Sequence, residues 1–230
     1  MNLLYCLFIV SNEALIPSIF HQHRKTGIMN KLIGMMDSPY VRRVAISLEL
    51  YGVEFESHPL SVFSSFDAFS QINPAVKAPT LVLDNGIRLM DSSLILDYFE
   101  AQAAGERKLL PIAADALARD LQVLGFMLAA GEKAVQNVYE HQLRPTEKQH
   151  HPWIERITRQ LLAACREWNT LLEDRPIATD PDQVAVTNTV IWTFIQARSP
   201  DIVDAQEFRH IQSLAELFEN HAAFKKHPYR

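Results

Sequence analysis

The spacing of hydrophobic residues changes once along this chain of 230 residues, and that change limits what the chain can fold into. Over residues 31–102, short apolar runs bounded by turn residues alternate with helical stretches. From residue 113 onward, apolar residues recur only at the three- and four-residue spacing of helices. The sequence therefore predicts an α+β domain at residues 31–104, a linker at residues 105–112 and an all-helical domain at residues 113–230.

The first domain opens with the signals of a strand, a helix and a second strand. An apolar run at residues 31–36 precedes Ser38 and Pro39, which suit the N-cap and first position of a helix. We expect this helix to end near residue 51, where Gly52 follows. Residues 53–60 alternate well enough to form the second strand, parallel to the first.

A second half completes the domain with a hairpin and a helix. Residues 67–72 suggest a short helix, and residues 78–83 a strand with a proline at its entrance. The sequence Asp-Asn-Gly at residues 84–86 predicts a tight type I′ turn. Residues 87–90 are then the antiparallel return strand, and Asp91 begins the last helix.

The spacing also predicts which helix faces are buried. In the first helix the buried stripe is Val41, Val44, Ala45 and Leu48. Arg42 and Arg43 lie largely off that stripe. In the last helix of the domain the buried side is Leu94, Ile95, Tyr98 and Phe99.

The all-helical domain contains at least four helices, separated by breaks at prolines. We expect them at residues 113–142, 153–173, 182–198 and 207–220. Asp182 suits the N-cap of the third of these.

The first 30 residues are expected to lie outside the fold. Their apolar run, residues 3–10, has eight residues and lacks the preceding positive region of a signal peptide. It is also far short of the roughly 20 residues needed to span a bilayer. An extension is favoured here over a targeting segment, which stays the alternative.

Charge and cysteine content narrow the function. A net charge of -5 provides no basic excess for nucleic acid or an anionic membrane surface. Cys6 and Cys165 are far apart and lack ligand spacing, and the nine histidines show none either, so we predict neither a disulfide framework nor a metal. A reducing, cytoplasmic environment is the simple expectation.

Three separated motifs carry a family resemblance. They are Ser-Pro-Tyr-Val-Arg-Arg at residues 38–43, Asn-Pro-Ala-Val-Lys-Ala-Pro-Thr-Leu at residues 73–81 and Asp-Ser-Ser-Leu-Ile-Leu-Asp-Tyr-Phe at residues 91–99. In order and spacing the chain resembles the cytosolic glutathione transferases, the bacterial branch in particular. The resemblance implies a thioredoxin-like N-terminal domain (βαβ-ββα), an all-α C-terminal bundle, glutathione as co-substrate and a homodimer.

The active-site turn of that family corresponds to Ser38. A free thiol has a pKa of about 8.5 and is mostly protonated at pH 7. The Ser38 hydroxyl, at a helix N-terminus, could donate a hydrogen bond that stabilises the thiolate of glutathione. The alternative is a plain N-cap role. Tyr40 is the second candidate for the thiol contact, because several transferase classes use a tyrosine near this turn.

The other two motifs imply the remaining glutathione contacts. Pro79 resembles the family's cis-proline, which leaves the backbone of Ala78 free to pair with the cysteinyl part. Lys77 suits the glycine carboxylate, Asp91 the γ-glutamyl ammonium and Ser92 its carboxylate. The family usually has glycine where this chain has Val76, and glutamate or glutamine where it has Asp91.

An electrophile pocket is harder to locate. Phe126, Met127, Trp192 and Phe194 could line an apolar pocket, although aromatic residues at helical spacing are more often core.

The resemblance favours an enzyme that conjugates glutathione to small hydrophobic electrophiles or reduces peroxides. Thiol–disulfide chemistry would need a cysteine at position 38, where this chain has serine. A non-catalytic binding or regulatory protein is the remaining alternative.

Overall fold

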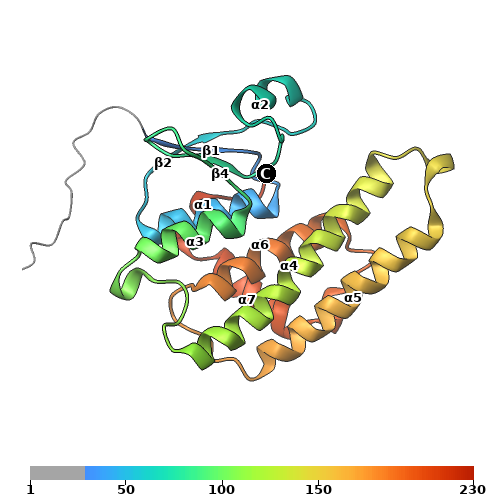
Figure 1. Ribbon diagram of the computed structural model, residues 1–230. Helices are drawn as coiled ribbons and strands as arrows, with labels where there is room; N and C mark the ends of the chain where they lie inside the picture. The colour runs from blue at the N-terminus through green and yellow to red at the C-terminus, as the bar shows by residue number, and fades with distance from the viewer. Residues whose placement is uncertain (1–28) are drawn as a thin grey trace, which may run out of the picture.

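A four-stranded mixed sheet organises the N-terminal part of the computed structural model, which describes residues 29–230 (Figure 1). The strands are β1 (Asn30–Ile33), β2 (Phe55–His58), β3 (Thr80–Val82) and β4 (Arg88–Met90). Their order in the sheet is β2-β1-β3-β4, with β1 parallel to β2 and antiparallel to β3. β3 and β4 form an antiparallel hairpin. This is the predicted thioredoxin-like arrangement.

The first strand begins at the last residue of the predicted N-terminal extension, residues 1–30. Asn30 is the first residue of β1, and its side chain donates to the backbone oxygen of Glu54 over 3.2 Å. The rest of the predicted extension, residues 1–28, lies outside the described residues.

Helices cover both faces of the sheet. α1 (Pro39–Tyr51) and α3 (Ser92–Gln102) lie below it in Figure 1, and α2 (Phe66–Ile72) lies above it. The Ser38 N-cap and a left-handed Gly52 (φ 73°) bound α1 as predicted. Its predicted stripe is fully buried.

Two predictions of helix faces were right only in part. Arg42 and Arg43 are 1% and 4% exposed, because the helical domain covers a second face of α1. In α3, Leu94 and Tyr98 are 63% and 41% exposed, and the buried face consists of Ile95, Leu96 and Phe99.

The hairpin turn also differs from the predicted type I′. Gly86 has a positive φ of 85°, whereas Asn85 does not. The N–H of Gly86 donates to the oxygen of Leu83, and the N–H of Leu83 donates to the oxygen of Ile87. The loop therefore has three residues, a type I turn followed by a left-handed glycine, which is the next most common hairpin connection.

The C-terminal region is helical, which confirms the predicted fold class. Its helices are α4 (Ala114–Gln142), α5 (His151–Glu173), α6 (Gln183–Arg198), α7 (Arg209–Glu219) and α8 (Ala222–Lys226). α8 was not predicted, since five residues are too few for a periodic pattern. Asp182 caps α6 as expected, accepting from the Ala185 N–H at 2.8 Å. Within residues 29–230, no helix is long and apolar enough to cross a membrane.

The core of this region is built around α6. From residue 183 to 195, every residue of α6 except Thr193 is buried. Trp168 of α5 donates its indole N–H to Asn188 over 3.0 Å, which satisfies both polar groups in the core. Cys165 is also buried, and burial raises the pKa of its thiol to about 12.

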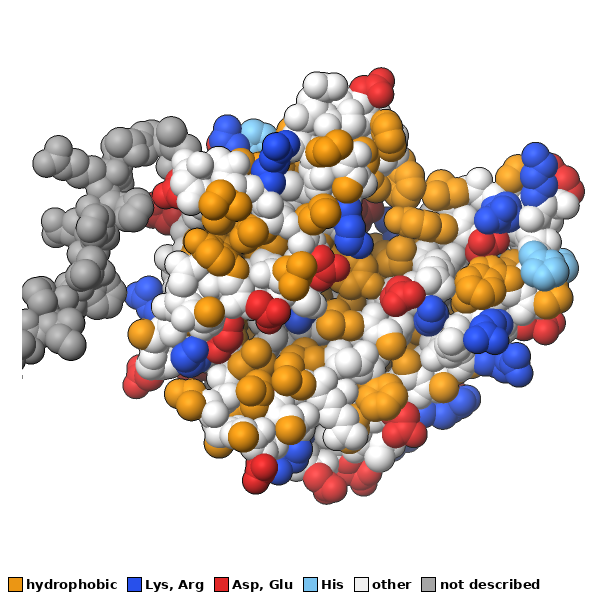
Figure 2. Space-filling model, in the orientation of Figure 1, with side chains coloured by type: hydrophobic (Ala, Val, Ile, Leu, Met, Phe, Trp, Pro, Cys, Tyr) orange, Lys and Arg blue, Asp and Glu red, His pale blue; other side chains and the backbone are white. Residues whose placement is uncertain are grey.

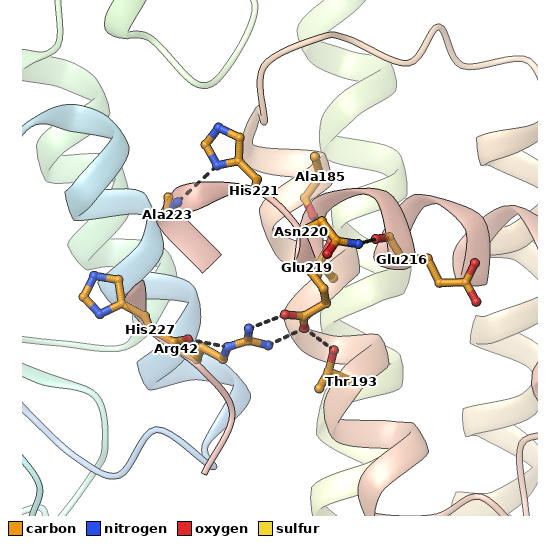
Figure 3. Close-up of polar contacts among 10 residues, drawn as sticks. Arg42, Ala185, Thr193, Glu216, Glu219, Asn220, His221, Ala223 and His227 are labelled. Carbon is orange, nitrogen blue, oxygen red and sulfur yellow. Dashed lines mark hydrogen bonds and ion pairs between the residues drawn. The ribbon is translucent and has the colours of Figure 1, made fainter. Parts of the chain in front are cut away.

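A buried ion pair joins α1 to the C-terminus (Figure 3). The Arg42 guanidinium donates to both carboxylate oxygens of Glu219 over 2.6 Å, and its Nε donates to the backbone oxygen of His227 over 2.8 Å. Thr193 of α6 donates to the same carboxylate. The pair therefore links α1 to α6, α7 and the terminal segment.

Candidate active site

A cleft of about 1140 Å³ opens where the N-terminal domain meets α4. Figure 2 shows apolar side chains gathered around this hollow. The structure places all the predicted glutathione contacts in its lining: Ser38, Lys77, Ala78, Pro79, Asp91 and Ser92, together with Tyr40. These residues come from three loops that lie far apart in the sequence, and the thioredoxin-like topology brings them together.

Ser38 occupies the cleft end of α1. Its Oγ accepts a hydrogen bond from the N–H of Val41 at 3.4 Å, which is long for such a bond. No residue of the described chain accepts a hydrogen bond from its O–H. The Ser38 O–H therefore remains available as a donor at the cleft, beside the positive end of the helix dipole.

The Ala78–Pro79 peptide bond is cis, as the resemblance implied. β3 begins only at Thr80, so Ala78 lies at the cleft outside the sheet. Thr80 Oγ1 donates to the oxygen of Lys77 over 2.7 Å and accepts from the Asn73 amide over 2.8 Å. These side-chain bonds hold the loop that presents Lys77 and Ala78.

Val76 stands in the left-handed region, with φ 47°. A β-branched residue is unfavourable there. Two bonds to Asn73 keep the turn closed: its Oδ1 accepts from the N–H of Ala75 at 3.0 Å, and its backbone oxygen accepts from the N–H of Val76 at 2.9 Å. The turn therefore closes with valine at this position, at a cost in backbone strain.

We expect Val76→Gly to raise the free energy of unfolding by about 1 kcal/mol, since the strain removed exceeds the added entropy of glycine in the unfolded chain. Urea denaturation measures the change. Val82→Gly is the control, because Val82 lies in β3 with ordinary strand geometry and its loss should destabilise the protein. A destabilised Val76→Gly would show that the valine side chain contributes more than its strained backbone costs.

Asp91 and Ser92 form the third wall, at the N-terminus of α3. Asp91 has φ 71° and ψ 127°, and its Oδ1 accepts from the N–H of Ser93 at 3.0 Å. Strained backbone of this kind concentrates at ligand sites. Ser92 is 4% exposed and lines the cleft beside it.

Arg43 supports this wall from within the protein, and no local pattern in the sequence indicates that role. Its guanidinium donates to the hydroxyl oxygens of Ser92 and Ser93, each at 3.2 Å, and to Thr187 at 2.9 Å. Burial lowers the pKa of Arg43 to about 10, against the opposing effect of the Asp91 carboxylate, so the group stays charged at pH 7. A buried positive charge therefore lies directly behind Ser92.

Three of the four residues predicted for an electrophile pocket do not line the cleft. Met127 and Trp192 are buried in the core, and Phe126 packs against it; the cleft lining includes none of the three. Phe194 does line the cleft. The apolar wall consists instead of Leu128, Ala129, Val135, Val138 and Tyr139.

The lining of the cleft also contains an aromatic contact and an ion pair. The rings of Phe63 and Tyr139 meet edge to face with centroids 5.4 Å apart. Arg198, at the end of α6, contacts Asp37 at 3.1 Å, next to Ser38. Among the residues that the structure describes, no group of three His, Cys, Asp or Glu side chains could hold a metal ion.

Comparison with known proteins agrees with this geometry. Residues 32–107 match the family described as "Glutathione S-transferase, N-terminal domain". A curated relative, "Glutathione S-transferase U7" from Arabidopsis thaliana, is 34% identical over 70 residues, which are 30% of this chain and 31% of that protein. The chain thus spans about a third of the length of the curated relatives it matches.

Solved structures extend the likeness over both domains. A glutathione transferase family member from Pseudomonas fluorescens Pf-5 with bound glutathione is 26% identical, with a TM-score of 0.74 over 87% of this chain and 99% of that one. A glutathione S-transferase from Methylobacterium radiotolerans in complex with glutathione sulfonate is 24% identical, with a TM-score of 0.80 over 87% and 95%. These comparisons establish the fold and support the glutathione transferase family.

Proposed function

We propose that this chain is a glutathione transferase, which activates the thiolate of glutathione for attack on small hydrophobic electrophiles. One observation carries the proposal: Ser38, Ala78 and Ser92, predicted from three separate motifs to contact glutathione, line a single cleft. The bound glutathione of the Pseudomonas fluorescens structure supports the choice of ligand.

The chemistry of the lining matches glutathione group by group. The γ-glutamyl carboxylate is assigned to Ser92 at the N-terminus of α3, with Arg43 behind it, and the ammonium to Asp91. The backbone of Ala78 suits the cysteinyl amide, and the exposed Lys77 suits the glycine carboxylate. The thiol then lies at Ser38.

Thiolate formation is the step that the protein must favour. Lowering the thiol pKa from about 8.5 by two units requires about 2.7 kcal/mol. A hydrogen bond from Ser38 to the anion contributes about 1.5 to 3 kcal/mol, and the α1 dipole adds to it. The thiolate then attacks an electrophile held by the apolar wall of α4, and the same thiolate suits peroxide reduction.

Glutathione binding tests this function directly. We expect the protein to be retained on immobilised glutathione and eluted by free glutathione, and Ser92→Ala to raise the Kd about tenfold or more, because a hydrogen bond to a carboxylate is lost. Ser213→Ala, an exposed change on α7, is the control and should bind as the wild type does. A wild-type protein that is not retained would instead favour the non-catalytic binding or regulatory role.

We further propose a homodimer, consistent with the resemblance. Exposed apolar residues lie on α3, on the first half of α4, and on or next to β4; they are Ile87, Met90, Leu94, Tyr98 and Leu121. Figure 2 shows apolar side chains exposed on this side of the molecule. Exposed apolar surface of this kind typically marks an interface. The buried free thiol of Cys165 fits the proposed cytoplasmic location.

Sedimentation should report a dimer for the wild type and a monomer for Leu94→Arg, since an unpaired charge at an apolar interface is costly. Leu217→Arg is a matched control, because Leu217 is 50% exposed on α7, away from this surface. A dimer that survives Leu94→Arg would place the interface elsewhere.

A further inference from the structure

The turn that carries Ser38 is only partly held by its own backbone. The N–H of Ser38 donates to the oxygen of Met35 over 3.1 Å, which closes a β-turn with Asp37 at its third position. Met35 is 37% exposed, and the Ser38 hydroxyl oxygen has only a long bond of 3.4 Å to the N–H of Val41. The direction of the Ser38 hydroxyl therefore depends on contacts that other parts of the chain make with this turn.

One such contact comes from the helical domain. Nη2 of Arg198, the last residue of α6, donates to Oδ2 of Asp37 over 3.1 Å. Within residues 29–230, no other side chain of the helical domain forms a hydrogen bond or ion pair with residues 34–38. Arg198 also lines the cleft together with Asp37 and Ser38. The position of the turn thus depends on where Arg198 is held.

Arg198 is held in turn by the C-terminal segment. Its Nε donates to the hydroxyl oxygen of Tyr229 over 2.9 Å. A planar guanidinium bonded through two nitrogens to two different residues has a fixed orientation. The side chains of Arg198 and Asp37 are 33% and 38% exposed, and an isolated pair at such exposure adds little to stability. Position, more than stability, is what this contact provides.

The segment that carries Tyr229 is anchored to the N-terminal domain, and the C-terminus lies beside that domain in Figure 1. The backbone oxygen of His227 accepts from Nε of Arg42 over 2.8 Å (Figure 3). The His227 ring stacks on Phe55 of β2, with ring centroids 5.5 Å apart. A continuous path therefore runs from α1 through the C-terminal segment and Arg198, and returns to the turn that begins α1.

We propose that Arg198 is a positioning residue for thiol activation: held by Tyr229, it fixes the turn so that the Ser38 hydroxyl donates to the thiol of glutathione. The proposal rests on the proposed function, because it requires the thiol at Ser38. Since Arg198 acts through the turn, its effect depends on the Ser38 hydroxyl. The C-terminal segment then contributes to activation although it makes none of the proposed glutathione contacts.

The ionisation of bound glutathione tests this role without any electrophile. The ultraviolet absorbance of the thiolate, followed against pH, gives the acid ionisation constant Ka of the bound thiol. We expect Arg198→Ala to lower Ka about tenfold, because the bond from Ser38 to the thiolate is weakened. Tyr229→Phe removes only the acceptor of the Nε bond and should lower Ka about two- to threefold. Urea denaturation should show both variants folded, since the ion pair is exposed.

Turnover gives a second readout. With benzyl chloride as the electrophile and at a pH below the pKa of the bound thiol, kcat/KM should fall by the same factor as Ka. The Kd of glutathione should stay nearly unchanged, because Arg198 contacts none of the groups assigned to its binding. Arg209→Ala, which removes an exposed arginine at the start of α7, is the matched control and should behave as the wild type does.

A double variant separates positioning from a direct effect of the guanidinium charge. In Ser38→Ala the hydroxyl is already absent, so adding Arg198→Ala should lower Ka no further. An additional fall as large as in the single variant would overturn the proposal and assign the effect to the charge.

The proposal and the proposed function fail in different ways. A wild-type Ka in Arg198→Ala would overturn the role of Arg198 and leave the proposed function intact. A wild-type Ka in Tyr229→Phe alone would overturn the part assigned to the C-terminal segment. A wild-type protein that binds no glutathione would overturn the proposed function, and this role of Arg198 with it.

Discussion

Replacing Ser38 with alanine is expected to lower kcat/KM for glutathione conjugation by about a hundredfold. The mutation removes the O–H that we propose to donate to the thiol, while the backbone N–H groups and the dipole of α1 remain. The pKa of the bound thiol should return toward about 8.5, so the rate lost at pH 7 should be partly recovered at alkaline pH. The measurements are the pH dependence of kcat/KM and the ultraviolet absorbance of the bound thiolate.

The N-cap role of Ser38 needs its own control. Alanine at an N-cap costs about 1 kcal/mol of stability, so activity has to be compared well below the unfolding temperature. Ser38→Thr keeps both a hydroxyl and a cap and should retain most of the activity. If Ser38→Ala kept the wild-type thiolate pKa, thiol activation would have to be assigned to the helix dipole and not to the serine.

Breaking the ion pair between Arg42 and Glu219 is expected to cost about 3 kcal/mol of folding free energy. Glu219→Leu would leave a guanidinium that is 1% exposed without a carboxylate partner. Glu219 itself is 34% exposed, so the loss should fall at the lower end of the range for buried pairs. Urea denaturation at pH 7 measures the change.

The double variant Arg42→Met/Glu219→Leu supplies the control. Without either charge the site is apolar, and much of the stability should return. A double variant as unstable as Glu219→Leu alone would show that the bond from Arg42 to the His227 oxygen carries most of the energy.

The same pair predicts a pH dependence. Burial tends to raise the pKa of Glu219, but the hydrogen bonds from Arg42 and Thr193 outweigh it and hold the pKa below its ordinary value of 4.5. Because the pKa is lower in the folded protein than in the unfolded chain, the stabilisation is fully present above pH 4.5 and is lost as the pH falls through the folded value. Glu219→Leu should therefore flatten the loss of stability in acid.

The parts of the fold that follow from local signals were predictable from the sequence. Ser38, Pro39 and Gly52 mark both ends of α1, and the Asp-Asn-Gly segment at residues 84–86 marks the hairpin. The type of that turn was not predictable, because the same residues suit two- and three-residue loops.

The burial of Arg42 and Arg43 depends on contacts that no local pattern contains. The apolar stripe of α1 predicts one buried face. Contacts with α6 and α7 bury the second: Arg43 bonds to Thr187, 144 residues away in the sequence, and Arg42 bonds to Glu219, 177 residues away. For the same reason the motifs predicted the cleft residues that come from the N-terminal domain, whereas three of the four apolar residues predicted from the helical domain lie in or against the core. The core and cleft faces of α4 both carry apolar residues, so their residue types do not distinguish them. Only the packing of the helix places Met127 in the core and Leu128 in the cleft.

The N-cap and first turns of α1 carry four residues that each contact a different part of the protein. Ser38 faces the cleft, Tyr40 reaches α4, Arg42 joins α7 and the terminal segment, and Arg43 joins α3 and α6. Loosening this helix would disturb the residues of the proposed active site and the junction between domains in one event. Heat inactivation should consequently follow the same curve as global melting, with no temperature range in which a folded protein has lost its activity.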